Sequence, residues 1–258
     1  MDDQRWVGAT VGILIAHNLV QNRFLNDRGY VGGNLAVSGL LVGVGRASGL
    51  SWEEMGLGPG DLRQGLRLGA AASATGAALG LLAISHPRTR AVLRDERAVV
   101  APDRGGWRRV LLRFPLGTAL FEEVAFRGVL SGLLRQTHRP GPAEALSAAA
   151  FGLWHLIPTG RALAGNPLGR DVSGVQRLAL ILGGSMAAGA SGLCLARMRR
   201  NTGSLLAPWL VHSAFNSLSY LAGVAALRLG DGRRKHMPTS RSDSTVTQGA
   251  STTITRVT

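Results

Sequence analysis

The sequence predicts an all-α polytopic membrane helix bundle with seven or eight transmembrane helices, and three observations support this prediction. Apolar residues make up 45% of the 258 residues and charged residues only 17%, whereas soluble proteins have roughly 25% charged residues. The chain contains 36 glycines, and small residues let helices pack closely in lipid. The apolar stretches are dominated by Gly, Ala and Leu and lack the alternation of a strand.

Seven apolar segments mark the expected helices. They cover residues 5–20, 31–46, 65–85, 110–134, 143–157, 177–196 and 204–228. A helix needs about 20 residues to cross a bilayer, and the third, fourth, sixth and seventh segments reach that length. The shorter segments are expected to extend into polar flanks, to tilt or to lie against protein. Pro115 predicts a kink or a first turn in the fourth segment, and an eighth helix requires division of the first or last segment.

Composition also divides the chain into three parts. We expect N-terminal transmembrane helices in residues 1–50, a core in 51–228 and a disordered basic tail in 229–258. The tail consists mainly of Ser, Thr, Gly and Arg, so it has too few apolar residues to fold. The first apolar run has no small-residue cleavage site, which predicts a retained membrane helix and not a signal peptide.

The charge balance favours a membrane over nucleic acid as partner. The net charge is +14, and Lys235 is the only lysine beside 28 arginines. The arginines fall between the apolar segments, and the chain has no zinc-finger, basic-zipper or RNA-binding motif. With seven spans, the loops on the side of the C-terminus hold more Arg and Lys. This predicts a multi-pass protein of the cell membrane, in contact with lipid, with a cytoplasmic C-terminus. The lone Cys194 excludes an intramolecular disulfide.

Polar side chains interrupt three of the apolar segments. They form three groups along the chain: Glu122, Glu123 and Arg127, then Phe151 with His155, then His212 with Asn216. Ionisable groups inside a membrane are costly, and they usually face the interior of a bundle or a wet cavity. Three such groups on three helices therefore predict one shared cavity.

Helical spacing predicts how these side chains are directed. Residues four apart lie on the same face of a helix, so Glu123 is expected to pair with Arg127. Glu122 lies about 100° further round the helix and is expected to point elsewhere. His212 and Asn216 share a face by the same rule.

These residue types are suited to the hydrolysis of a peptide bond. A carboxylate near an imidazole can take a proton from water and make the water nucleophilic. An imidazole N–H and an amide can stabilise the oxyanion that forms when water attacks a carbonyl. Glu122, His155 and His212 could instead hold a zinc ion, so the sequence leaves the cofactor open as zinc or none.

Motifs of other membrane proteases are missing or out of place. No His is followed by Glu, so the zinc motif HExxH is lacking. GPGD at residues 58–61 matches the aspartyl motif GxGD, but neither tyrosine precedes an aspartate as the partner motif YD requires. GGSM at 183–186 does not supply the serine motif GxSG.

The three polar groups, in this order, resemble the motifs of the CAAX protease and bacteriocin-processing family, also called the Abi family, of intramembrane proteases. The family pattern is EExxxR, FxxxH and HxxxN. The chain has EEVAFR at 122–127, FGLWH at 151–155 and HSAFN at 212–216. The resemblance covers about residues 50–228.

The resemblance implies an eight-helix-like membrane fold with a cavity open toward the cytoplasm and a protease core in residues 51–228. It implies that Glu122 is the general base and that His155 helps to position the attacking water.

The same resemblance assigns roles to the remaining residues of the motifs. Arg127 would hold Glu123, which orients the site. His212 and Asn216 would stabilise the oxyanion. Family members include enzymes that trim prenylated C-terminal tripeptides, and others act in bacteriocin self-immunity or as scaffolds.

The leading hypothesis is therefore an intramembrane endopeptidase acting on a membrane-associated peptide or protein, for which a lipidated C-terminus is one candidate. An alternative is a non-catalytic membrane scaffold or immunity protein that retains the pocket. A transporter that binds protons or cations at Glu122 and Glu123 is a third reading, and the lack of paired inverted halves in the sequence counts against it.

Overall fold

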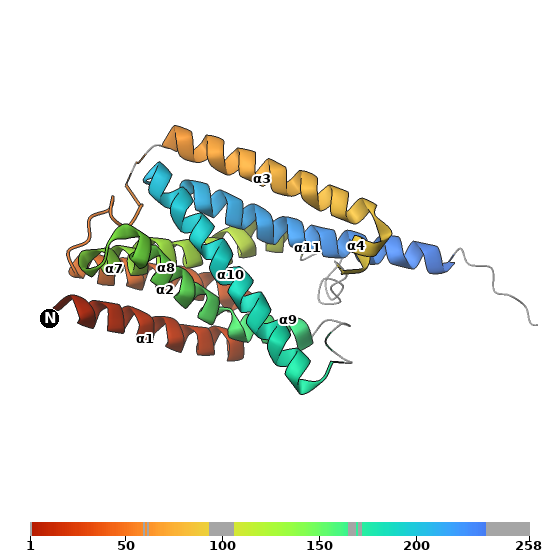
Figure 1. The fold of residues 1–258 in the computed structure, drawn as a ribbon, viewed down its shortest axis with the longest axis horizontal. Coiled ribbons are helices and arrows are strands. Elements are labelled where there is room, and N and C mark those ends of the chain that lie inside the picture. The colour runs from red at the N-terminus through yellow and green to blue at the C-terminus, as the bar shows by residue number, and fades with distance from the viewer. Residues whose placement is uncertain are drawn as a thin grey trace, which may run out of the picture.

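The computed structural model describes residues 2–58, 60, 62–92, 106–164, 169 and 172–235, and within these ranges the fold contains helices and no strands (Figure 1). The all-α prediction is confirmed for this part of the chain. The first helices are α1 (Asp2–Arg23), α2 (Asp27–Ala47), α3 (Leu62–Ser85) and the short α4 (Pro87–Val92).

A nearly straight succession of helical pieces follows, which we call the central helix. It consists of α5 (Gly106–Arg108), η2 (Arg109–Ala119), α6 (Leu120–Glu122), η3 (Glu123–Leu130) and α7 (Ser131–Thr137). The last helices are α8 (Pro140–Trp154), α9 (Leu156–Ala164), α10 (Gly174–Thr202) and α11 (Leu206–Lys235). Each predicted apolar segment coincides with one of these helices, with the central helix, or with the pair α8 and α9.

Within the described ranges, three helices are long and apolar enough to cross a membrane: α3, α10 and the part of α11 from Leu206 to Leu229. The predicted total of seven or eight spans stays a prediction. The helix α11 continues to Lys235, so the first residues of the predicted tail, 229–235, are helical. The rest of the tail, 236–258, and most of the Arg-rich loop, 93–105, lie outside the described residues.

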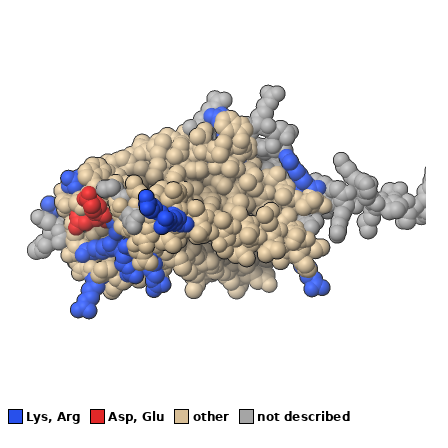
Figure 2. Space-filling model, turned by 90° about the horizontal axis from the view of Figure 1, so that it is seen from above, with Lys and Arg blue, Asp and Glu red and all other residues tan. Residues whose placement is uncertain are grey.

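The outer surface of the bundle is apolar, as expected for a protein in lipid. Leu79, Leu81 and Leu82 on α3 are all more than half exposed, and so are Val175 and Met186 on α10. On the face drawn in Figure 2, charged side chains gather toward the two ends, and a broad uncharged expanse separates them. Large exposed apolar patches of this kind are rare in soluble monomers, so the surface fits a membrane protein.

The central helix forms the core of the bundle. Phe121, Phe126 and Val129 are at most 1% exposed and belong to one apolar cluster, which also includes Leu14 of α1 and Leu41 of α2. The helix α2 packs on η2, and α11 packs on both η2 and α3. The central helix is therefore enclosed on several sides: residues 121–134 are all buried, whereas Trp107 and Leu111 near its start are exposed.

Pro115 lies inside the central helix, which continues on both sides of it. Proline lacks a backbone N–H and its ring crowds the preceding turn, so it normally kinks or breaks an α-helix. Here η2 is π-helical, and the Leu120 N–H bonds to the Pro115 carbonyl five residues back. The wider turn accommodates the ring without ending the helix. The expected kink or first turn is thus a π-helical segment.

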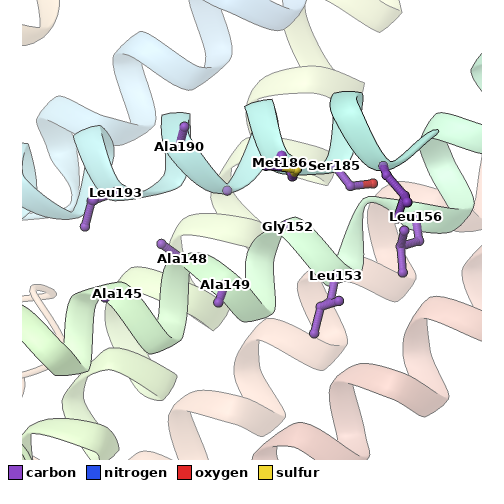
Figure 3. A pocket seen from close by; sticks show the side chains of 12 residues that line it. Ala145, Ala148, Ala149, Gly152, Leu153, Leu156, Ser185, Met186, Ala190 and Leu193 are labelled. Atoms are coloured by element: carbon purple, nitrogen blue, oxygen red, sulfur yellow. The ribbon is translucent and has the colours of Figure 1, made fainter. Parts of the chain in front are cut away.

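Small residues let α8 and α10 approach each other closely. A Cβ on Gly152 would lie 2.9 Å from the Ser185 carbonyl oxygen and 3.4 Å from Cα of Gly189. Beside this crossing the two helices line a groove of about 540 Å³ whose walls are almost wholly apolar, with Ala148 and Met186 among them (Figure 3). The groove opens on the apolar surface, as expected where lipid chains meet the helices.

This close crossing predicts that Gly152→Ala destabilises the protein. The new methyl group must push against backbone atoms, and overpacking of this kind costs about 1–3 kcal/mol. Gly183→Ala is the matched control, because a Cβ at Gly183 of α10 meets nothing within 4 Å. Thermal unfolding in detergent micelles should show a lower Tm for Gly152→Ala and an equal or higher Tm for the control. Equal Tm values for the two variants would contradict the packing described here.

Candidate active site

Two adjacent carboxylates lie at the junction of α6 and η3, in the middle of the central helix. Glu122 is 5% exposed and Glu123 is fully buried. Phe121 and Val124 on either side belong to the apolar core, so the carboxylates are held inside the bundle by the packing of their neighbours. Buried charges need partners, and the following contacts supply them.

Arg127 pairs with Glu123, as the spacing of four residues predicts. Its Nη1 lies 3.1 Å from Oε1 of Glu123, and the arginine is only 2% exposed. The guanidinium also lies over the Phe151 ring, with Cζ 4.0 Å from the ring centre. Gly192 of α10 makes room for this arrangement, because a Cβ there would lie 3.0 Å from Cδ1 of Phe151 and 3.1 Å from Nη2 of Arg127.

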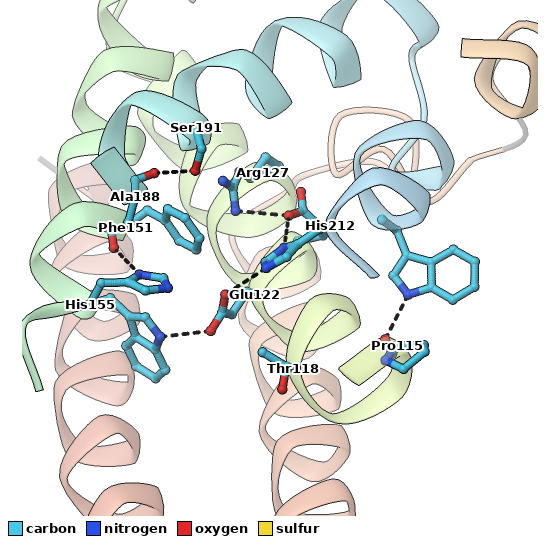
Figure 4. A network of polar contacts seen from close by, with 12 residues as sticks. Pro115, Thr118, Glu122, Arg127, Phe151, His155, Ala188, Ser191 and His212 are labelled. Atoms are coloured by element: carbon cyan, nitrogen blue, oxygen red, sulfur yellow. Dashed lines mark hydrogen bonds and ion pairs between the residues drawn. The ribbon is translucent and has the colours of Figure 1, made fainter. Parts of the chain in front are cut away.

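His212 of α11 lies between the two carboxylates. Its Nδ1 is 2.8 Å from Oε1 of Glu123, and its Nε2 is 3.5 Å from Oε2 of Glu122. The two carboxylates therefore share one imidazole. The side chains leave the helix in different directions, but the two nitrogens of one imidazole ring lie on opposite sides and meet both carboxylates (Figure 4).

The two oxygens of Glu122 have different surroundings. Oε1 accepts a hydrogen bond from the indole Nε1–H of Trp154 at 3.1 Å. Oε2 is buried and has no hydrogen bond partner among the described residues, with Nε2 of His212 as its ion-pair neighbour. One oxygen is thus held in place, and the other faces the imidazole without a hydrogen bond.

His155 lies at the C-terminal end of α8, where the helix breaks before α9. Its backbone N–H bonds to Gly152 and Leu153 instead of continuing the α-helical pattern, which leaves the Phe151 carbonyl for the ring. Nδ1 donates to that carbonyl at 2.8 Å, so Nε2 is the nitrogen that stays available. The ring of Phe151 lies against that of His155, with the two ring centres 4.4 Å apart.

Figure 4 shows the side chains of Glu122, His155 and His212 directed into the space between the central helix, α8 and α11. The histidine that contacts Glu122 is His212, and no direct contact of Glu122 with His155 is found in the described part of the chain. Asn216 lies one turn beyond His212 on α11 and is half-buried. Within the described ranges, the side chain of Asn216 makes no hydrogen bond.

The donors do not form a metal site as they stand. Among the described residues, no three His, Cys, Asp or Glu side chains are grouped so that they could hold a metal ion. This holds for the three candidate zinc ligands, Glu122, His155 and His212. The residues present therefore do not fit a bound zinc ion.

Two features of the site were missed by reasoning from motifs. Trp154 precedes His155 in FGLWH, and its N–H holds Glu122. His17 and Asn18 of α1 contact Trp154, with a stacked ring at 6.4 Å and a hydrogen bond to its carbonyl at 2.9 Å. The signal in the sequence is the polar stripe Thr10, His17, Asn18 and Gln21 on one face of an apolar helix, and these four residues are all buried.

The fold and the cluster define a class of protein. An apolar surface encloses a buried group of two carboxylates, an imidazole and a guanidinium, and such groups inside a membrane mark functional sites. The chain is a helical membrane protein of this kind.

One family model matches part of the chain. Residues 105–218 match the family model described as Type II CAAX prenyl endopeptidase Rce1-like. This segment, just under half of the chain, contains all three polar groups, and the match confirms the resemblance to the CAAX protease family. No curated protein and no solved structure matches the chain. The match shows that this segment is similar to the CAAX prenyl endopeptidase family.

The pairing of Arg127 with Glu123 predicts a large loss of stability in Arg127→Met. Without Arg127 the buried pair Glu122 and Glu123 keeps only the imidazole of His212 as a possible cation, so one buried negative charge is uncompensated, which costs about 3–5 kcal/mol. Arg200→Met is the control: Arg200 pairs with the buried Glu144 at 3.0 Å, but Glu144 keeps Arg135 at 2.8 Å. Chemical unfolding in micelles should separate the two variants clearly. A loss in Arg127→Met no larger than in Arg200→Met would show that the Glu123 charge does not depend on Arg127.

Proposed function

We propose that the protein is an intramembrane endopeptidase that cleaves a membrane-associated peptide by attack of a water molecule activated by Glu122. The observation that carries the proposal is the free oxygen of Glu122. It is buried, lacks a hydrogen bond among the described residues and lies 3.5 Å from Nε2 of His212. A carboxylate oxygen of this kind, next to an imidazole, is suited to take a proton from water.

Charge balance supports the role of His212 as a donor. Glu122 and Glu123 carry two negative charges, and Arg127 carries one positive charge. When His212 carries a proton on each nitrogen, the four groups sum to zero, which suits a site from which water is largely excluded. Nδ1–H then donates to Glu123 and Nε2–H faces the reaction space, where it can stabilise an oxyanion.

The reaction follows from these positions. Glu122 removes a proton from water, and the water oxygen forms a bond to the carbonyl carbon of the peptide. The carbonyl oxygen becomes an oxyanion, to which His212 and Asn216 donate hydrogen bonds. The carbonyl then re-forms, the C–N bond breaks, and Glu122 returns its proton to the leaving amine. The free Nε2 of His155 holds the attacking water in line.

The surroundings of the site support a membrane-associated substrate. The helices that hold the cluster expose apolar surface to lipid, so a substrate reaches the site from the membrane. The family description names prenyl CAAX peptides, and we propose a lipidated C-terminus as the first substrate to test. We also propose that the protein lies in the cell membrane with its C-terminus in the cytoplasm, with bilayer lipid as its other partner.

Replacement of Glu122 by Gln tests the proposal directly. An amide cannot accept the proton, so cleavage of a prenylated CAAX peptide in lipid vesicles should fall by at least about 10²-fold, the scale for a lost general base. Glu53→Gln, at an exposed carboxylate outside the cluster, should keep full activity, and both variants should show the same helical content and Tm. Unchanged cleavage by Glu122→Gln would reject the role of Glu122.

Removal of metal tests the glutamate mechanism against a zinc mechanism. The donors do not group around a common point, so activity should persist after exhaustive treatment with a strong chelator. The measurement is the cleavage rate of the same peptide before and after chelation, and again after zinc is added back. Loss of activity on chelation with recovery on zinc would assign the reaction to a metal-bound water.

A further inference from the structure

Trp154 links the N-terminal helix to the candidate base. Its indole Nε1–H donates to Oε1 of Glu122 at 3.1 Å, and its backbone carbonyl accepts from Nδ2 of Asn18 at 2.9 Å. Trp154 is 5% exposed and Asn18 is 8% exposed, so both hydrogen bonds lie inside the bundle. One residue thus contacts α1 with its backbone and Glu122 with its side chain.

The Trp154 carbonyl is available to Asn18 because α8 ends there. The last carbonyls of a helix have no N–H partner further along the same helix, and α8 ends at Trp154. A carbonyl left without a donor inside lipid costs free energy. The amide of Asn18 supplies that donor, and it thereby fixes the position of the α8 terminus relative to α1.

The orientation of Asn18 is itself determined by a neighbour. Nδ2 of Asn22, one turn further along α1, donates to Oδ1 of Asn18 at 2.6 Å. With its oxygen occupied, the Asn18 amide presents its nitrogen to Trp154. An asparagine held in this way is a directed donor and not merely a buried polar residue.

His17 supports the indole ring from the same helix. Its ring stacks with Trp154 at 6.4 Å and meets the edge of Phe121 at 5.0 Å. Nε2 of His17 bonds to Oδ1 of Asn34 on α2, so the ring is anchored to the second N-terminal helix as well. Phe121 directly precedes Glu122, and the contacts of α1 therefore reach both sides of the carboxylate.

We propose that Trp154 is a positioning residue for Glu122 and that Asn18 of α1 acts on the reaction through Trp154. The inference rests on the proposed function of Glu122. The indole N–H holds one carboxylate oxygen, which leaves the other free and directed toward His212 and the attacking water. Residues 1–50, which lie outside the family match, thereby contribute to the active site.

The test compares two tryptophans in the intact protein. Trp154→Phe keeps an aromatic ring in the core but removes the N–H, and kcat for the prenylated CAAX peptide should fall roughly tenfold with KM unchanged, the scale of one hydrogen bond to a charged group. Trp209→Phe is the matched control, because its indole N–H also bonds to the central helix, at the Pro115 carbonyl 2.9 Å away. It should keep the kcat of the native protein. Equal losses of kcat in the two variants, or no loss in Trp154→Phe, would overturn the positioning role.

The contribution of α1 is tested by coupling. Asn18→Leu has nearly the same size and no donor, and it should lower kcat in the native background. In the Trp154→Phe background it should have little further effect, because residues that act through one another are not additive. If the effects of Asn18→Leu and Trp154→Phe on kcat are fully additive, or if Asn18→Leu leaves kcat unchanged, Asn18 does not act through Trp154. If Trp154→Phe fails to fold, the kcat of Asn18→Leu in the native background is still measured. A lower kcat then supports the inference, and an unchanged kcat overturns it.

A measurement without substrate separates this inference from the proposed function. The indole N–H resonance of Trp154, assigned by its loss in Trp154→Phe, should shift in Glu122→Gln and in Asn18→Leu but stay in place in Glu53→Gln. An unshifted resonance in Glu122→Gln overturns the inference and leaves the proposed function standing. A shifted resonance with full cleavage activity in Glu122→Gln rejects the proposed function, and the role of Trp154 in the reaction with it, while the hydrogen bond from Trp154 to Glu122 stands.

Discussion

Two carboxylates, one imidazole and one guanidinium share a volume inside the bundle, and the rest of the structure depends on keeping these four groups together. Moving an isolated ion out of water costs several kcal/mol even after relaxation, so each group needs the others. Glu123 is the centre of the arrangement, because one of its oxygens contacts both Arg127 at 3.1 Å and His212 at 2.8 Å. The helix α11 must therefore lie against the central helix, and the packing of α11 is a condition for burial of the charges.

The shape of the central helix follows from the same constraint. Glu122 and Glu123 are adjacent, and both must reach His212, which approaches from one side. The π-helical stretch η2 ends at Ala119 and η3 begins at Glu123 itself, and π-helical turns are frequent at functional sites. The carbonyl of Pro115 accepts both a π-helical N–H and the indole N–H of Trp209 on α11. Irregular helix geometry and interhelical contact thus occur at the same place.

The sequence predicts the helices and the polar residues well, since both depend on local information. Apolar segments locate the helices, and the spacing of four residues predicts the contact of Glu123 with Arg127. Which imidazole meets Glu122 is set by how α11 crosses the central helix, and no local pattern encodes that crossing. The direction of the His155 ring depends on the break at the end of α8, which frees the Phe151 carbonyl. The π-helical turn around Pro115 likewise arises from packing, and a kink was the natural expectation from sequence.

The N-terminal helices show how a site can extend beyond the segment that carries its motifs. Residues 105–218 match the family model and hold all three polar groups, so motif reasoning alone makes α1 and α2 a membrane anchor. Yet α1 turns a polar face inward and an apolar face outward: His17 and Asn18 are buried, whereas Ile15 and Leu19 are more than half exposed. Polar side chains in a membrane helix are costly unless they bind a partner. The partner of Asn18 is Trp154, which donates to Glu122, so the inward face of α1 is connected to the buried cluster by two hydrogen bonds.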